Sequence, residues 1–135
     1  MKMLIDTHIM LWALTDASKF PKKAKEVIYD PQNEIYYSII SIWEATIKRL
    51  KHPDQITDLK PEELIQFCKD ADYHGLPLRA KHISTLETLS RPDDAPTHKD
   101  PFDRILISQA KSEHMTFLSH DDNLLYYNEP CILCV

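Results

Sequence analysis

Short apolar runs and segments of helical periodicity alternate along the whole chain, which leaves few folds open to it. The apolar runs are rich in Ile, Tyr and Phe, as buried strands are, and apolar residues recur three and four positions apart between them. The expected strands are residues 2–6, 34–40, 76–78, 116–119 and 131–135, and the expected helices are residues 8–14 (after a Thr7 cap), 21–29, 41–51, 61–73, 80–89, 101–113 and 122–127. This order predicts an α/β fold, a three-layer sandwich in which helices flank a short, mostly parallel central sheet.

The length and charge of the chain limit its organisation and its partners. A chain of 135 residues without a repeat or linker predicts a single domain over residues 1–135. The formal net charge is −5, whereas proteins that bind nucleic acid through charge alone are usually basic. A nucleic-acid substrate would therefore be held locally, by a metal ion or a basic rim. Gly75 is the only glycine, which excludes phosphate-binding loops and dinucleotide fingerprints, since both need several.

The three cysteines do not indicate a disulfide framework. Cys131 and Cys134 have the spacing of a zinc or redox motif, but their surroundings are apolar, and a short strand is the favoured interpretation. Cys68 belongs to an amphipathic segment and is expected in the core, together with Leu64, Ile65, Phe67 and Ala71. The apolar stretch of residues 9–14 is too short to span a membrane, and polar residues interrupt any signal sequence. We therefore expect a cytoplasmic protein.

Four carboxylates occupy equivalent places relative to the expected elements. Asp6 ends the first strand, Glu44 lies in the first turn of the helix after the second strand, Asp103 lies in the first turn of a later helix, and Asp121 follows the fourth strand. In an open parallel sheet, the carboxyl ends of the strands and the N-termini of the following helices share one edge, where ligands bind. The fold would therefore bring the four acids into one site.

Helix capping is an alternative explanation for three of these acids, because carboxylates are favoured at helix N-termini whatever the function. The segment Ser41-Ile42-Trp43-Glu44 matches a capping box, and a similar spacing holds around Asp103. Either Asp121 or Asp122 can be a simple N-cap. Asp6 differs, because it closes an apolar strand at a position where capping does not require an acid.

The coincidence of all four acids favours a metal site over four separate caps. Neighbouring carboxylates repel one another and raise one another's pKa, and a bound cation relieves that cost. Mg²⁺ prefers a few carboxylates together with water and phosphate oxygens, and such a site can assist displacement at a phosphodiester. We therefore interpret the four acids as catalytic residues and as ligands of Mg²⁺.

Four segments carry these acids in a recognisable order. They are Met3-Leu4-Ile5-Asp6-Thr7-His8, Ser41-Ile42-Trp43-Glu44, His98-Lys99-Asp100-Pro101-Phe102-Asp103-Arg104 followed by Gln109-Ala110, and Phe117-Leu118-Ser119-His120-Asp121. Together they resemble the motifs of PIN-domain ribonucleases, and in particular the VapC-type toxins of bacterial toxin–antitoxin pairs. The resemblance implies an endoribonuclease that depends on Mg²⁺ or Mn²⁺, forms a homodimer and is inhibited by a cognate antitoxin. It assigns the metal-site roles to Asp6, Glu44, Asp103 and Asp121.

Several neighbouring residues are weaker candidates. Asp100 either supports the site or caps a helix, and Arg104 is a candidate for pairing with an acid or with substrate. Ser119 stands where the family usually has threonine and keeps the hydroxyl group. Trp43 is expected in the core rather than stacked on a base, and His98 is expected to be solvated rather than bound to phosphate.

Two other functions remain as alternatives. The first is a non-catalytic PIN-like interaction module, although the retention of all four acids argues against it. The second is another carboxylate- and magnesium-dependent phosphohydrolase. A phosphatase of that kind would have a second acid two residues after its nucleophilic aspartate, and Asp6-Thr7-His8 lacks one. Metal-dependent cleavage of RNA distinguishes these functions.

Overall fold

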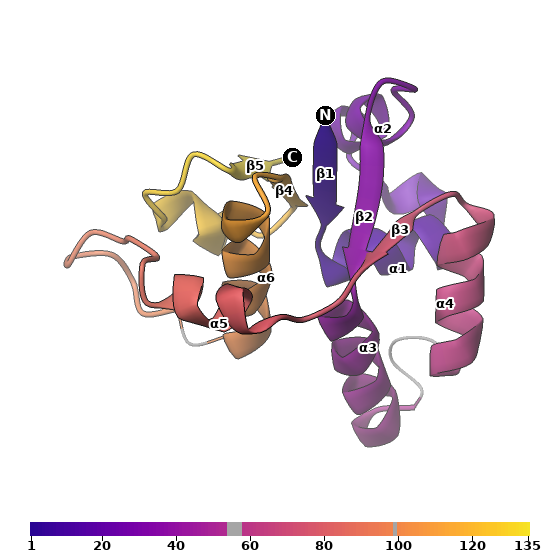
Figure 1. The fold of residues 1–135 in the computed structure, drawn as a ribbon. Coiled ribbons are helices and arrows are strands. Elements are labelled where there is room, and N and C mark those ends of the chain that lie inside the picture. The colour runs from indigo at the N-terminus through magenta and orange to yellow at the C-terminus, as the bar shows by residue number, and fades with distance from the viewer. Residues whose placement is uncertain (54–57, 99) are drawn as a thin grey trace.

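The computed structural model describes residues 1–53, 58–98 and 100–135, and a five-stranded sheet forms its centre (Figure 1). The strands are β1 (Lys2–Ile5), β2 (Glu34–Ser38), β3 (His74–Leu76), β4 (Thr116–Ser119) and β5 (Ile132–Cys134). They lie in the order β3-β2-β1-β4-β5, and each neighbouring pair is parallel. Parallel neighbours need long crossover connections, and helices provide most of them here.

Helices cover the sheet on two sides, with α5 and α6 on the left in Figure 1 and α1 and α4 on the right. The helices are α1 (Thr7–Thr15), α2 (Lys22–Ile28), α3 (Ile39–Lys51), α4 (Pro61–Asp70), α5 (Ala80–Leu86) and α6 (Pro101–Ser112), with short 3₁₀ segments η1 (Ala17–Lys19) and η2 (Asp122–Tyr126). Within the described ranges, none of these helices is long and apolar enough to cross a membrane. The predicted α/β architecture is confirmed.

Strand β1 lies in the middle of the sheet and is buried on both faces. Met3 and Ile5 pack into a core that includes residues of α1, α2, α3 and α4. Leu4 packs into a second core with β4 and α6. Because successive side chains of a strand point to opposite faces, one strand separates two cores, and the molecule has three layers.

Two sequence expectations about the core have different outcomes. Cys68 is fully buried, as expected, and the C-terminal cysteines are free thiols at the end of the sheet, in and beside β5. Ile65 and Phe67 were expected to face inward, but 39% and 43% of their surfaces are exposed. Helix α4 contacts the core through the single row of Leu64 and Cys68, so the residues that flank this row remain at the surface.

The position of β3 depends on Gly75. This strand covers residues 74–76 instead of the expected 76–78, and Gly75 lies inside it opposite Tyr37 of β2. A Cβ atom at Gly75 would lie 3.1 Å from the Tyr37 hydroxyl oxygen. The missing side chain therefore lets the edge strand approach the tyrosine ring closely.

Candidate active site

Asp6 connects β1 to α1 and is almost fully buried, with 4% of its surface exposed. Its Oδ1 accepts a hydrogen bond of 2.8 Å from the backbone N–H of Ile9, so Asp6 is the N-cap of α1. The other carboxylate oxygen accepts the hydroxyl proton of Ser119, at the end of β4. The expectations that Thr7 caps this helix and that Asp6 has no capping role were wrong, because the helix begins one residue earlier.

Glu44 lies in the second turn of α3 and is 3% exposed. The helix begins at Ile39, and its N-cap is Ser38, whose hydroxyl accepts the N–H of Ile40 at 3.0 Å. The capping box of Ser41 and Glu44 is therefore not formed. The apolar residues 39 and 40 were expected to extend β2, but the strand ends at Ser38 and the helix follows at once.

The Glu44 carboxylate is held by two side chains. Lys48, one turn further along α3, places its Nζ 2.6 Å from Oε2. Thr7 Oγ1 lies 2.7 Å from Oε1 and 2.9 Å from the Ser41 hydroxyl oxygen. An ionised carboxylate only accepts, so the Thr7 proton goes to Glu44 and Ser41 donates to Thr7. The spacing of Glu44 and Lys48 could have indicated the first contact, but no sequence signal indicates the second.

If Glu44 is a ligand in a metal-dependent ribonuclease site, as the sequence motifs predict, replacing Thr7 by valine should lower RNA cleavage by about tenfold or more, the usual effect of losing a side chain that orients a metal ligand. Valine keeps the shape of threonine and removes the proton that fixes Glu44. Cleavage rates at saturating Mn²⁺ measure the effect. Thr7→Ser should retain most activity, and Thr46→Val, which loses only a bond to its own helix, should behave as wild type. Equal rates for Thr7→Val and wild type would show that Glu44 needs no such support.

Asp103 and Asp121 approach from the other side of the sheet. Asp103 occupies the first turn of α6, whose N-cap is Asp100. Oδ1 of Asp100 accepts the N–H groups of Phe102 at 2.9 Å and Asp103 at 3.3 Å, so Asp100 has a capping role. Asp121 caps η2 through the N–H of Asn123 at 2.9 Å, whereas the neighbouring Asp122 is exposed.

The site concentrates negative charge. Burial raises the pKa of Asp103 to about 8, and the charges of Asp100, Asp121, Glu44 and Asp6 add to the rise. Burial also raises the pKa of Asp6, against the hydrogen bonds from Ser119 and Ile9. These oxygen donors fit a divalent cation, which would relieve the repulsion between them.

His98 is a further residue of the site, and its expected solvation was wrong, since 9% of its surface is exposed. Its Nδ1 lies 2.8 Å from the hydroxyl oxygen of Tyr127, and its Nε2 lies 3.4 Å from Oδ2 of Asp103. The loop before α6 packs against the segment after η2, where Arg91 covers the Tyr127 ring at 4.9 Å. A loop position says nothing of such packing, so the sequence did not indicate it.

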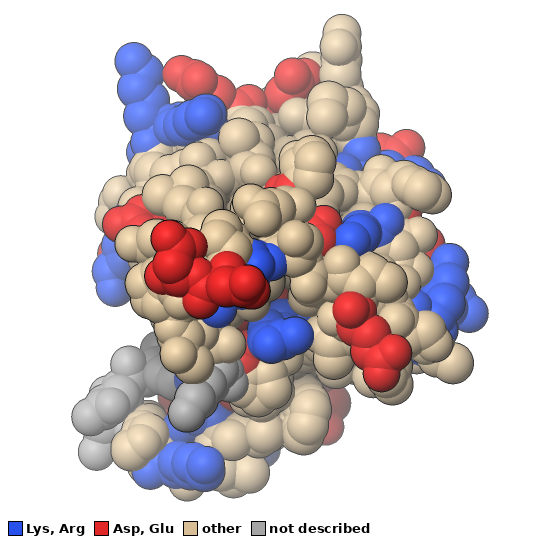
Figure 2. All heavy atoms as spheres, turned by 90° about the vertical axis from the view of Figure 1, so that its left-hand side faces the viewer, with Lys and Arg blue, Asp and Glu red and all other residues tan. Residues whose placement is uncertain are grey.

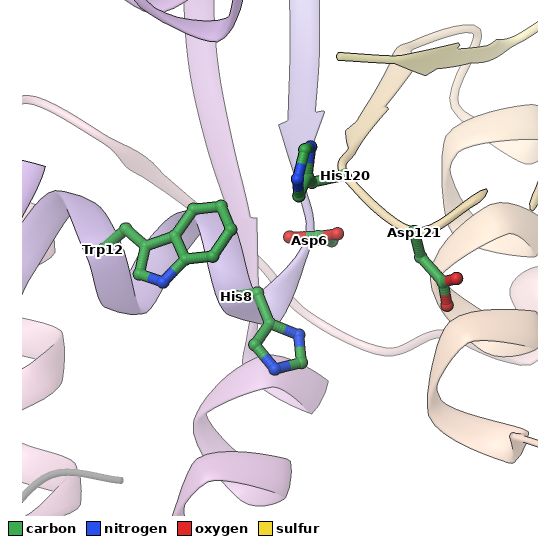
Figure 3. Close-up of a pocket in the computed structure, with 5 residues that line it drawn as sticks. All are labelled: Asp6, His8, Trp12, His120 and Asp121. Atoms are coloured by element: carbon green, nitrogen blue, oxygen red, sulfur yellow. The ribbon is translucent and has the colours of Figure 1, made fainter. Parts of the chain in front are cut away.

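A pocket of about 310 Å³ opens beside two of the acids (Figure 3). Asp6 lies between His8 and His120, and Asp121 enters from the segment after β4. Trp12 of α1 completes the lining, with its ring centroid 5.6 Å from that of His120 and 6.3 Å from that of His8. The pocket thus combines carboxylates with aromatic faces.

The geometry agrees with comparisons to known proteins. A family model of the PIN domain matches residues 3–129. The chain belongs to the PIN-domain family. No curated protein sequence is significantly similar to it.

Three solved structures share the fold of this PIN domain. A chain of VapBC2 from Rickettsia felis, bound to a DNA fragment from its promoter, has a TM-score of 0.67 at 14% identity and covers 100% of this chain and 98% of its own. A chain of DNA-bound VapBC from Salmonella typhimurium has a TM-score of 0.67 at 14% identity, with coverages of 99% and 98%. A chain of a toxin–antitoxin complex from Klebsiella pneumoniae has a TM-score of 0.55 at 16% identity, with coverages of 96% and 94%.

Other candidates of the PIN domain lie at the margin of the acidic site. Trp43 was expected in the core, but 56% of its surface is exposed. Its ring meets that of Phe102 edge-on, with the ring centroids 5.2 Å apart. Arg104 forms no ion pair with any acid in the described ranges, and it lines a second pocket with Arg91 and His98. Lys99 lies outside the described residues.

Proposed function

We propose that this PIN domain is an endoribonuclease that uses Mg²⁺ or Mn²⁺ to hydrolyse RNA, with Asp6, Glu44, Asp103 and Asp121 as catalytic and metal-binding residues. One observation carries the proposal: carboxylates from four separate elements meet at a buried position, where burial and then their mutual charges raise the pKa of Asp103 to about 8. Carboxylates that disfavour one another's ionisation destabilise the folded protein when no ligand is bound. A divalent cation between them offsets that cost.

The residues of the chain would share the work of hydrolysis. A bound divalent ion stabilises charge on phosphate oxygens and makes a neighbouring water easier to deprotonate. Ser119 and the Ile9 N–H orient Asp6, and Thr7 and Lys48 orient Glu44. The N-termini of α1 and α6 open onto the same site and favour an anionic substrate.

The surface supports local recognition of RNA. Figure 2 shows acidic and basic groups interspersed over the face that carries α5 and α6, in keeping with the net charge of −5. A general positive field therefore does not attract the substrate. The exposed ring of Trp43 and the aromatic pocket at Trp12 provide surfaces on which bases can stack.

The structural neighbours are chains of toxin–antitoxin complexes, which supports a toxin role for this protein. We infer that the protein acts in the cytoplasm on cellular RNA and that a cognate antitoxin binds and inhibits it.

Purified protein should cleave RNA in Mg²⁺ or Mn²⁺, and the cleavage should stop when EDTA removes the metal.

Unopposed expression of the protein should inhibit bacterial growth, and Asp6→Asn at equal protein level should relieve the inhibition. A non-catalytic module would neither cleave RNA nor respond to Asp6→Asn, and a different phosphohydrolase would consume small phosphate esters but not RNA. Cleavage that persists in a demonstrably metal-free sample would refute the mechanism.

We also expect a homodimer, because several large apolar side chains remain at the surface. Leu50 is 74% exposed, Leu125 66% and Ile83 54%. Burial of such side chains in an interface is favourable because it removes apolar surface from water. Light scattering at high micromolar concentration measures the mass, and a monomer would contradict the expectation.

A further inference from the structure

His98 has a buried nitrogen atom without a hydrogen bond. Within the described ranges, Nε2 is inaccessible to solvent and has no hydrogen-bond partner. Asp103 Oδ2 is 3.4 Å away, but this pair does not have hydrogen-bond geometry. A buried polar atom without a hydrogen bond destabilises the folded state, so this nitrogen atom needs a physical explanation.

The nitrogen atom is aimed at two carboxylates. One ligand atom each from His98, Asp103 and Asp121 lies within 4.8 Å of the others. The three residues come from different segments: the loop before α6, the first turn of α6 and the segment after β4. Small adjustments of the side chains would let all three bind one ion.

The other ring nitrogen is fixed for this purpose. Nδ1 lies 2.8 Å from the hydroxyl oxygen of Tyr127, which is buried. Histidines that bind metals almost always donate their second N–H to a fixed acceptor. When Nδ1 donates to Tyr127, Nε2 carries a lone pair that faces the acids.

We propose that His98 Nε2 is a direct nitrogen ligand of the cation held by Asp103 and Asp121, and that it gives the site a preference for Mn²⁺ over Mg²⁺. The proposal rests on the metal site of the proposed function and adds an imidazole to its oxygen ligands. Mg²⁺ takes oxygen ligands almost exclusively, whereas Mn²⁺, a transition metal that also favours oxygen ligands, accepts an imidazole nitrogen more readily. A site of one imidazole and two carboxylates therefore discriminates between the ions, which four carboxylates alone do poorly.

Pulsed electron paramagnetic resonance of the protein with MnCl₂, without RNA, tests the ligand directly. Nitrogen bound to Mn²⁺ gives a hyperfine coupling that oxygen ligands do not. We expect the coupling in wild type and its loss in His98→Ala. It should persist in His8→Ala and His120→Ala, which remove the histidines on either side of Asp6. Bound Mn²⁺ without nitrogen coupling in the wild type would overturn the proposal, whether or not His98→Ala folds.

Titration calorimetry on the same samples tests the preference. His98→Ala should weaken Mn²⁺ binding by about tenfold or more, since even the loss of residues that only orient ligands costs that much. Mg²⁺ binding should change much less, and an equal loss for both ions would contradict a nitrogen ligand. RNA cleavage in excess Mg²⁺ separates the two proposals. A wild type that cleaves without nitrogen coupling refutes only this inference, and a wild type that binds no metal and does not cleave refutes both.

Discussion

Replacing Asp103 by asparagine should nearly eliminate RNA cleavage and, without metal, make the protein more stable. Both effects have one cause. Burial and the neighbouring charges of Asp100, Asp121 and Glu44 disfavour the ionised form of Asp103 and raise its pKa to about 8. Asparagine has almost the same shape and no charge, so the repulsion disappears together with the metal ligand. Cleavage should fall by about a hundredfold or more, the scale of losing a catalytic acid or base.

Glu44→Gln is the matched control for this result. Glu44 has a positive partner, Lys48, at 2.6 Å, so removing its charge breaks an ion pair, and this loss opposes the repulsion that is relieved at Asp103. We expect Glu44→Gln to lose cleavage activity without becoming more stable. Melting temperatures in EDTA and cleavage rates in Mn²⁺ on the same preparations measure both quantities. An Asp103→Asn protein that is less stable than wild type would show that the Asp103 side chain stabilises the folded state and does not destabilise it through repulsion.

The sequence predicted the fold because the relevant signals are local. Most of the strands are apolar runs, each long helix has apolar residues at helical spacing, and strands that alternate with helices pair in parallel. The common edge of the four acids follows from the same topology. Asp6, Asp103 and Asp121 lie at strand ends or helix starts, and those positions meet wherever parallel strands are neighbours.

The sequence could not predict which residue begins each helix. Residues 39 and 40 are apolar and suit a strand or a helix equally, and only the packing of α3 decides that the strand ends at Ser38. This shift moves Glu44 from a capping position to the second turn. The same limit applies at Asp6, which caps α1 and also faces the acidic site. One residue can therefore cap a helix and also belong to the acidic site.

Burial of single side chains was the other limit, because it depends on contacts between distant segments. His98 is buried since Tyr127, 29 positions later, lies against it. Trp43 is exposed although it lies in an amphipathic helix, because its neighbour Phe102 covers only one edge. Hydrophobic periodicity says which face of a helix is apolar, but it does not say whether a partner covers that face.

Without metal, the protein should become more stable as the pH falls from 8 to about 6.5. The Asp103 carboxyl has a pKa of about 8 in the folded protein and an ordinary value of 3.8. Between these values the folded state holds a proton that the unfolded state has released. The free energy of unfolding therefore decreases as pH rises, by at most about 1.4 kcal/mol per pH unit. Over this window we expect a gain of about 1–2 kcal/mol on acidification.

Between pH 6.5 and 8, the other groups with shifted pKa values do not reverse the direction in which stability changes with pH. The raised pKa of Asp6 acts in the same direction as that of Asp103. Burial lowers the pKa of His98, so its imidazole resists protonation in the folded state, and it opposes the trend as the pH falls below its ordinary value of 6.5. Lowered pKa values, such as that of Glu113 beside Lys81 and His82, matter only at more acidic pH.

Denaturant titrations in EDTA measure how the free energy of unfolding changes with pH between 6.5 and 8. Two changes should alter this dependence. Asp103→Asn should flatten the profile, because its amide does not titrate. Excess Mn²⁺ should reverse it, since the ion binds ionised carboxylates and competes with protons, so that binding stabilises the folded state more as the pH rises. If the free energy of unfolding depended on pH equally in wild type and in Asp103→Asn, the titration of Asp103 would not be the cause of the dependence. The carboxylates would then be better described as separate helix caps than as one repulsive cluster.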